Sequence, residues 1–154
     1  MRRIIVHAEQ CAGCRQCEMV CSFQHTERFS PILSRVRVYR DDRNGLDYPV
    51  MCRQCEKCPP IDNCPTGAMK KDLRGVVNVD PQLCTGCGRC QELCKFEAVN
   101  LGLGQVLVCD TCQGNPQCVS RCPTGALEYV ESDEFTESVQ EAFNRMKKEW
   151  SLFE

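Results

Sequence analysis

The chain has 154 residues, a formal net charge of -2 and 16 cysteines, but only one Trp, three Tyr and six Phe. This charge excludes a basic nucleic-acid-binding domain, and no apolar run approaches the length that spans a membrane. Because the aromatic content is low, we expect cysteine chemistry to supply part of the stability of the fold.

The N-terminal stretch MRRIIVHAEQC has two arginines followed by only three apolar residues, so it lacks the apolar segment of a secretory signal. We therefore predict a cytoplasmic protein, in which thiols stay reduced. In that compartment a high cysteine content indicates metal or redox chemistry before it indicates a disulfide framework.

Short strands and helices are predicted around the cysteines. Strands are predicted at residues 3–7, 75–79 and 105–108, each ahead of a cysteine loop. Helices are predicted at residues 17–24 and 89–96, since these segments contain neither Gly nor Pro. The repetition of strand and cysteine loop is typical of ferredoxin-type domains, which are built from repeats.

The cysteines form four groups of four, with none left over. The groups are Cys11, Cys14, Cys17 and Cys21; Cys52, Cys55, Cys58 and Cys64; Cys84, Cys87, Cys90 and Cys94; and Cys109, Cys112, Cys118 and Cys122. The first and third groups open with CAGCRQC and CTGCGRC, a spacing typical of cubane iron-sulfur clusters. Gly13, Gly86 and Gly88 suit the tight loop that brings successive thiolates to a cubane. Structural zinc sites more often use two separated C-x2-C pairs, so a zinc-binding interaction module is the alternative from another functional class.

The spacing between groups indicates how they pair. Nineteen residues separate Cys64 from Cys84, much like the spacer within a two-cluster bacterial ferredoxin, which pairs the second group with the third and leaves the first to the fourth. In such folds the fourth cysteine of a run binds the other cluster. The predicted ligand sets are Cys11, Cys14, Cys17 and Cys122 for cluster 1; Cys52, Cys55, Cys58 and Cys94 for cluster 2; Cys84, Cys87, Cys90 and Cys64 for cluster 3; and Cys109, Cys112, Cys118 and Cys21 for cluster 4.

Several motifs resemble the four-cluster polyferredoxin subunits of molybdenum- and tungsten-pterin oxidoreductases. The motifs are CAGCRQCEMVCSF with His25, PILSRVRV at 31–38, the two CPTGA turns, CTGCGRCQELC, and CDTCQGNPQCVSRCPTGAL at 109–127. Together they extend over residues 3–130. The chain looks most similar to the small iron-sulfur subunits of tungsten-dependent aldehyde oxidoreductases and benzoyl-CoA-reductase-type complexes.

The resemblance implies a fold and a function. The fold would be α+β, with two interleaved bacterial-ferredoxin-like units in a polyferredoxin domain at residues 1–131, groups 1 and 4 forming one unit and groups 2 and 3 the other. The function would be relay of single electrons through four 4Fe-4S clusters, with no catalysis by this chain alone. The partners would be a tungsten- or molybdenum-pterin catalytic subunit and a flavin or ferredoxin. Formate dehydrogenase, hydrogenase or carbon monoxide dehydrogenase is the alternative partner.

Two positions depart from the pattern of the family. The second group of the family usually has the spacing C-x2-C-x4-C-x3-C-P, whereas this chain has C-x2-C-x2-C-x5-C. Cys58 is the only thiol available for the third ligand, and Pro59 with Pro60 stiffens the longer return to Cys64, so we predict a shifted ligand and a complete cluster. After Cys94, Lys95 stands where the family usually has Pro, which affects the local turn.

Charged residues and histidines accompany the cysteine loops. Cationic side chains lie in or beside the loops at Arg15, Arg53, Lys57, Arg89, Lys95 and Arg121. They are either ordinary solvated charges or groups that offset cluster charge and raise reduction potentials. Since the thiols already form complete ligand sets, no role is assigned to His7 and His25.

Residues 133–153, DEFTESVQEAFNRMKKEWSLF, carry apolar side chains at helical spacing, with acidic residues early and two lysines late. The apolar stripe comprises Phe135, Val139, Phe143, Met146 and Trp150. We predict a C-terminal amphipathic helix, assigned to residues 132–154. Its stripe can pack on the ferredoxin core or, with Phe143 and Trp150 as aromatic anchors, join a catalytic partner or a second copy of the chain.

Overall fold

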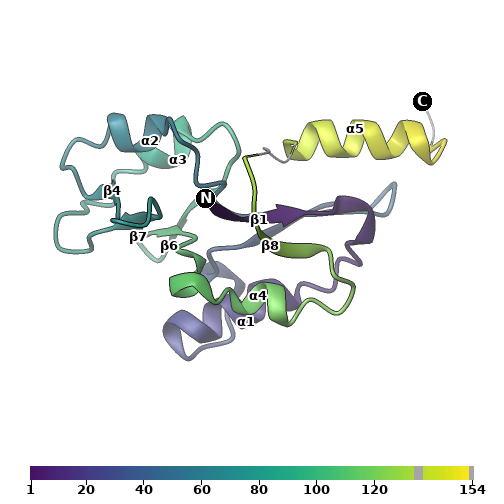
Figure 1. Cartoon of the computed structure of the whole chain (residues 1–154), viewed down its shortest axis with the longest axis horizontal. Helices are drawn as coiled ribbons and strands as arrows, with labels where there is room; N and C mark the ends of the chain where they lie inside the picture. The colour runs from purple at the N-terminus through teal and green to yellow at the C-terminus, as the bar shows by residue number, and fades with distance from the viewer. Residues whose placement is uncertain (134–136, 153–154) are drawn as a thin grey trace.

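The computed structural model describes residues 1–133 and 137–152, which form short helices and four two-stranded antiparallel sheets (Figure 1). The sheets pair β1 (Arg2–Val6) with β8 (Leu127–Glu131), β2 (Arg37–Asp41) with β3 (Leu46–Val50), β4 (Met69–Lys71) with β5 (Val77–Val79), and β6 (Val99–Gly102) with β7 (Gln105–Val108). The α-helices are α1 (Gln16–Thr26), α2 (Pro59–Asp62), α3 (Arg89–Leu93), α4 (Gln117–Ser120) and α5 (Val139–Glu149). Single 3-10 turns lie at Ala8–Gln10, Pro31–Leu33 and Thr111–Gly114.

The two ends of the cysteine-rich region come together. Strand β1 pairs with β8 in a register that places Ile4 opposite Tyr129, and α1 packs against α4. The middle of the chain supplies the other side of the molecule, where α2 packs against α3 beside β4, β6 and β7 (Figure 1). The first and fourth cysteine groups therefore share one region of the fold, and the second and third share another.

The apolar core has two parts. The larger part gathers side chains from β1, β3, β8 and α5, including the fully buried Tyr48 and Leu46. The smaller part consists of Met69, Val77 and Val99 with two further residues, one of which is a cysteine of the third group. Burial of such side chains stabilises the fold by the removal of apolar area from water, and cysteines stand at the edge of both parts.

The β2–β3 hairpin was absent from the sequence prediction. It turns at Asn44-Gly45, where Gly45 has φ +66° and the Asn44 amide donates to the Asp41 carbonyl oxygen at 3.1 Å. Asn-Gly is a strong hairpin signal because both residues tolerate positive φ. The hairpin buries Tyr48 and leads directly into the second cysteine group.

Element boundaries differ modestly from the predictions. Strand β1 is one residue earlier than predicted, β7 matches residues 105–108, and β5 begins only at Val77 because Gly75 closes a turn with φ +78°. Helix α1 spans two more residues at its C-terminal end than predicted. Helix α3 ends at Leu93, three residues before the predicted end, because Cys94 is extended and Glu97 has φ +54°.

The C-terminal helix is shorter than residues 132–154. Helix α5 begins at Val139 because Ser138 forms a capping box with Glu141, which satisfies amide groups at the helix start. Its apolar face, with Ala142, Phe143 and Met146, is buried in the larger core. Phe135 and the last two residues of the chain lie outside the described residues.

None of the helices in the described part of the chain combines the length and the apolar character needed to cross a bilayer.

Candidate iron-sulfur centres

Three cysteines of the second group and one cysteine of the third group surround a single cavity. Cys52, Cys55 and Cys58 come from the loop after β3 and the start of α2, and Cys94 follows α3. These four residues line a hollow with about 450 Å³ of empty space, together with Pro59 and Phe96. The shifted Cys58 therefore lies with the other three members of the predicted cluster 2 set.

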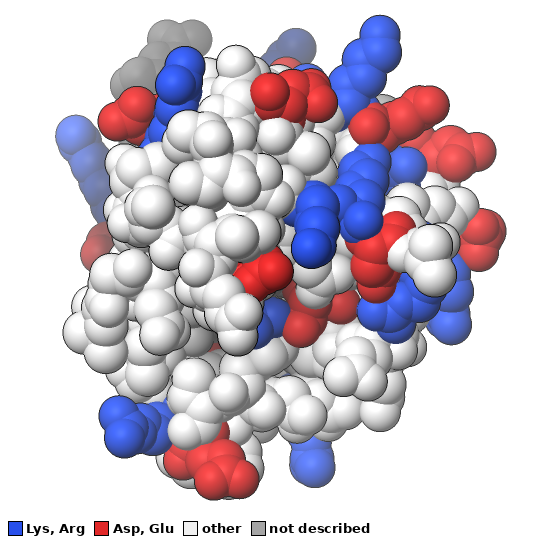
Figure 2. All heavy atoms as spheres, turned by 90° about the vertical axis from the view of Figure 1, so that its left-hand side faces the viewer, with Lys and Arg blue, Asp and Glu red and all other residues white. Residues whose placement is uncertain are grey.

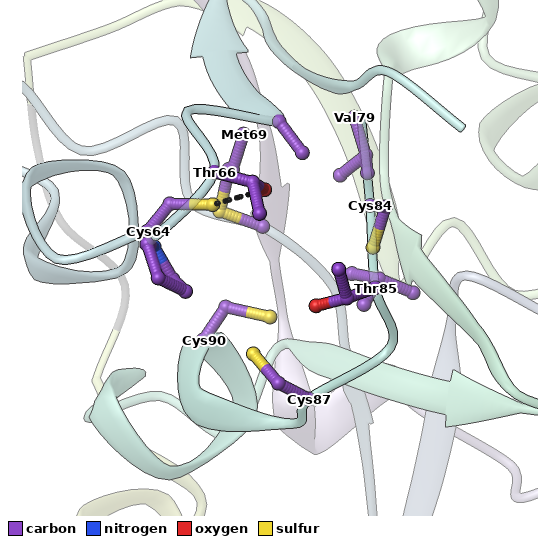
Figure 3. A pocket seen from close by; sticks show the side chains of 11 residues that line it. Cys64, Thr66, Met69, Val79, Cys84, Thr85, Cys87 and Cys90 are labelled. Atoms are coloured by element: carbon purple, nitrogen blue, oxygen red, sulfur yellow. Dashed lines mark hydrogen bonds between the residues drawn. The ribbon is translucent and has the colours of Figure 1, made fainter. Parts of the chain in front are cut away.

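Three cysteines of the third group meet Cys64 around another cavity. Cys84, Cys87 and Cys90 line about 330 Å³ of empty space with Cys64, and their side chains point into the same opening (Figure 3). Apolar side chains, among them Met69 and Val79, complete the wall. This is the predicted cluster 3 set.

Cysteines from the two ends of the chain share the remaining sites. Cys11, Cys14 and Cys17 line about 320 Å³ of empty space with Cys122, which are the predicted cluster 1 residues.

Cys21 faces the fourth group. Burial is the main cause that raises the pKa of the Cys109, Cys112 and Cys118 thiols. The nearby Cys21 thiol raises the pKa of each of them further. The structure thus brings together the thiols of all four predicted sets, and all 16 cysteines, which lie among the described residues, are free.

The four cysteine loops share one backbone feature. The residue just before the second cysteine has positive φ in every group: Gly13 (+62°), Gln54 (+53°), Gly86 (+67°) and Thr111 (+59°). A Cβ on Gly13 would lie 2.3 Å from Asp47 Oδ2, so that loop requires glycine for space as well as for conformation. Two loops therefore place a non-glycine residue in a left-handed conformation, which is uncommon and calls for compensating contacts.

Gln54 makes contacts of that kind and was not identified from the sequence. Its side chain is 1% exposed; Nε2 donates to the Cys109 carbonyl oxygen at 2.7 Å, and Oε1 accepts from the Val77 amide at 2.8 Å. These bonds join the loop of the second group to the loop of the fourth. The sequence did contain a signal for this role, because Gln54 stands at the position where the first and third loops have glycine.

Burial disfavours the charged form of several of these cysteine side chains. Burial raises the pKa of Cys17 and of Cys52 to about 12, and raises the pKa of Cys58. A buried thiolate is unfavourable unless a cation stabilises it, whereas iron binds the deprotonated form. Sets of four thiols around a hollow supply the ligand type and number that a 4Fe-4S cluster requires.

His25, to which the sequence assigned no role, lies beside the fourth site. Its Nδ1 lies 2.8 Å from the Cys21 carbonyl oxygen, and its Nε2 lies 3.1 Å from Asp110 Oδ1. Asp110 also pairs with Arg35 at 2.5 Å. Hydrogen bonds with Asp110 and Cys21 raise the pKa of His25 to about 10, so the ring is cationic at neutral pH. The His7 ring, by contrast, lies at the surface with Nε2 3.1 Å from Glu128 Oε2.

Known iron-sulfur and electron-transfer proteins are similar to this chain. Residues 77–100, which run from β5 into β6, match the 4Fe-4S binding domain family. The polyferredoxin-like subunit of an aliphatic sulfonate oxidoreductase from Pyrococcus furiosus is 38% identical over 122 residues, which cover 77% of this chain and 70% of that protein. The chain belongs to the polyferredoxin-like electron-transfer subunits. Another relative, the thiosulfate reductase electron transfer subunit PhsB from Salmonella typhi, is 33% identical over 147 residues, 85% of this polyferredoxin-like chain and 77% of that protein.

A solved structure gives the same family. A chain of the active site complex BamBC of benzoyl coenzyme A reductase, as isolated, matches 99% of this polyferredoxin-like chain and 91% of its own length, with 28% identity and a TM-score of 0.53. The family predicted from the cysteine motifs is confirmed, as is electron transfer through iron-sulfur clusters. The mixed helix and strand fold carries a 4Fe-4S binding domain.

Proposed function

We propose that this polyferredoxin-like subunit relays single electrons through four 4Fe-4S clusters and performs no bond-making chemistry of its own. The ligands are the four predicted sets, with Cys122, Cys94, Cys64 and Cys21 as the ligands that cross between groups. The observation that carries the proposal is the convergence of four thiols at each of four places in one small fold.

Two interleaved ferredoxin-like units hold these clusters. The β1–β8 sheet and the packing of α1 on α4 support a unit from the first and fourth groups. The packing of α2 on α3, with the short sheets of the middle segment, supports a unit from the second and third. We assign residues 1–131 to this polyferredoxin domain and residues 132–154 to a C-terminal extension that covers it.

The contacts between sites support one order for the relay, in which the electron passes the first, fourth, second and third clusters in turn or in reverse. The Cys17 thiol is close enough to Cys118 to act on its pKa, Gln54 joins the second and fourth loops, and Met69 lines both the second and third cavities. Neighbouring sites in this order are thus linked by nearby cysteines, by a hydrogen bond or by a shared residue. Electron tunnelling falls steeply with distance, so such spacing favours transfer along this path.

The terminal clusters are the natural points of entry and exit. Cys14 of the first site and Cys87 of the third are exposed. The face that carries α2 and β4 has a broad uncharged area on the left of the view, and charged side chains of both signs near its middle and on the right (Figure 2). An uncharged area bordered by charged side chains is typical of a protein interface.

One partner is the catalytic subunit of a tungsten- or molybdenum-pterin oxidoreductase, and the other is a flavin or ferredoxin redox protein. Similarity to the subunit of an aliphatic sulfonate oxidoreductase and to a chain of the BamBC complex supports the first partner. Co-purification of the chain with a pterin-containing subunit from its native host would support this choice. Recovery with a formate dehydrogenase, hydrogenase or carbon monoxide dehydrogenase subunit instead would contradict it.

Metal analysis tests the cluster count. Anaerobically purified protein should contain about sixteen iron atoms and about sixteen acid-labile sulfides per chain, and no stoichiometric zinc. Replacing Cys58 with Ser should reduce the iron to between about fifteen, for one lost atom, and about twelve, for one lost cluster. Twelve irons in the fully reconstituted wild-type protein would contradict the prediction that Cys58 completes the second cluster. Stoichiometric zinc without sulfide would favour the alternative of a structural zinc module.

A further inference from the structure

Arg53 is a buried cation inside the second cysteine loop. It stands directly after Cys52 in the sequence, its side chain is 4% exposed, and it lines the cavity shared by Cys52, Cys55, Cys58 and Cys94. Arginine is rarely buried to this extent unless it is paired, because removing a charge from water is unfavourable. The position therefore calls for a counter-charge.

The neighbours of the guanidinium do not supply that charge. Nη2 donates to the Tyr48 hydroxyl at 2.8 Å and to the Glu137 carbonyl oxygen at 3.1 Å, and the group lies over the rings of Phe96 and Tyr48 at 5.5 and 5.6 Å. Nε and Nη1 are buried and have no hydrogen-bond partner among residues 1–133 and 137–152. No carboxylate in those residues pairs with Arg53.

The thiols of the second site line this cavity, and they become anionic when they bind a metal cluster. A 4Fe-4S cluster with four thiolate ligands is anionic, and it becomes more negative by one charge when it is reduced. A fixed positive charge beside it stabilises the reduced state more than the oxidised state, which raises the reduction potential. The low polarity of a buried site makes this interaction stronger than it would be in water.

Further cations lie near the second site. Lys57 and Lys95 line the same cavity, and Lys71 Nζ donates to the Cys55 carbonyl oxygen at 2.6 Å. Lys57 and Lys95 are exposed, so water screens their charges. Of the cations that line the cavity, Arg53 is the buried one.

We propose that Arg53 is the built-in counter-charge of the second cluster and raises the reduction potential of that cluster. This inference rests on the proposed cluster ligands. Arg53 is a positioning and tuning residue, since the electron does not pass to it.

The test compares variants of the whole chain, purified without oxygen and loaded with clusters. Arg53→Met removes the charge while keeping a long side chain, and Arg53→Lys keeps the charge. Lys57→Met is the matched control, because Lys57 lies in the same loop and at the same cavity but is exposed, where water screens its charge. Potentiometric titration followed by electron paramagnetic resonance gives each midpoint, and the signal altered in Cys58→Ser identifies the second cluster.

Arg53→Met should change the ratio of reduced to oxidised second cluster at fixed potential by at least tenfold toward the oxidised form, a downward shift of about 59 mV for one electron. Lys57→Met should give a smaller shift than Arg53→Met, and Arg53→Lys should remain closer to the wild type than Arg53→Met. An Arg53→Met protein with full iron content and an unchanged midpoint would overturn the proposal.

Loss of the cluster is also informative. If Arg53→Met loses about four irons while Arg53→Lys keeps them, the charge is required to assemble the site, which supports the proposal. If both variants lose the same iron, the shape of Arg53 matters and its charge does not, which overturns it. A wild-type protein that already lacks the cluster removed by Cys58→Ser would instead refute the proposed ligand set.

Discussion

At the scale of single residues, the second cysteine loop serves two purposes with two adjacent side chains. Arg53 lines the cavity that three cysteines of its own loop share, whereas Gln54 bonds to the backbone of the fourth loop and of β5. The sixteen thiols and their grouping could be predicted from the sequence, because ligand spacing is local. The partners of Gln54 could not, because they lie 23 and 55 residues away along the chain.

Gln54→Leu should destabilise the protein by about 1 to 3 kcal/mol for each of the two buried groups that lose their partner. The substitution keeps the approximate size of the side chain but leaves the Val77 amide and the Cys109 carbonyl oxygen without Gln54. Gln113→Leu is the matched control, since Gln113 also has positive φ, +56°, but is exposed. Denaturant unfolding of the cluster-loaded protein measures both. Equal effects of the two substitutions would show that Gln54 does not join the loops.

At the scale of elements, α5 shows how an amphipathic pattern predicts a helix without identifying what covers its apolar face. Phe143 is 8% exposed and packs in the larger core, whereas Trp150 is 46% exposed. The two residues are therefore not equivalent anchors for a neighbouring subunit. Lys147 pairs with Asp41 at 2.7 Å, and the Tyr48 hydroxyl donates to the Glu137 carbonyl oxygen at 2.7 Å, so the segment is held to the β2–β3 hairpin at both ends.

Phe143→Ala should lower the free energy of unfolding by about 3 to 5 kcal/mol, because it leaves a cavity in a closed core. Trp150→Ala, at the exposed end of the same helix, should change it by less than about 1 kcal/mol. Thermal or denaturant unfolding distinguishes them. A small effect of Phe143→Ala would indicate that α5 does not pack on the core in solution.

Association with another subunit through the C-terminal segment stays a prediction. If it occurs, Trp150→Ala should weaken assembly with the catalytic partner or with a second copy while leaving stability nearly unchanged. Size measurement of the anaerobic complex reports this. Assembly that survives both Trp150→Ala and deletion of residues 132–154 would assign the helix to its own core alone.

At the scale of the whole molecule, four small sheets and a divided core are held around four cysteine sites. The largest sheet has only two strands, and such sheets have little stability by themselves. The spacing of groups predicted the pairing of the second with the third, because a short spacer limits where Cys84 can lie. The β1–β8 pairing was not predicted, because it depends on contacts between distant segments. The β2–β3 contribution to the core was not predicted either, because the Asn-Gly hairpin signal was not used.

Removing iron should abolish cooperative unfolding. Each cluster joins two segments of the chain, and metal binding to such sites is coupled to folding. Chelation under anaerobic conditions, followed by circular dichroism during heating, tests this. The α5 and β2–β3 contacts could preserve some structure, but an apo-protein with a sharp transition and native-like circular dichroism would show that the clusters are not part of the core.

The electron count tests the relay most directly. Anaerobic coulometric reduction of the purified, fully loaded chain should take up about four electrons, one for each 4Fe-4S cluster, and release them reversibly on reoxidation. Uptake of about three electrons with about twelve irons would contradict the completeness of the second site. A chain that contains metal but takes up no electrons would contradict the relay itself.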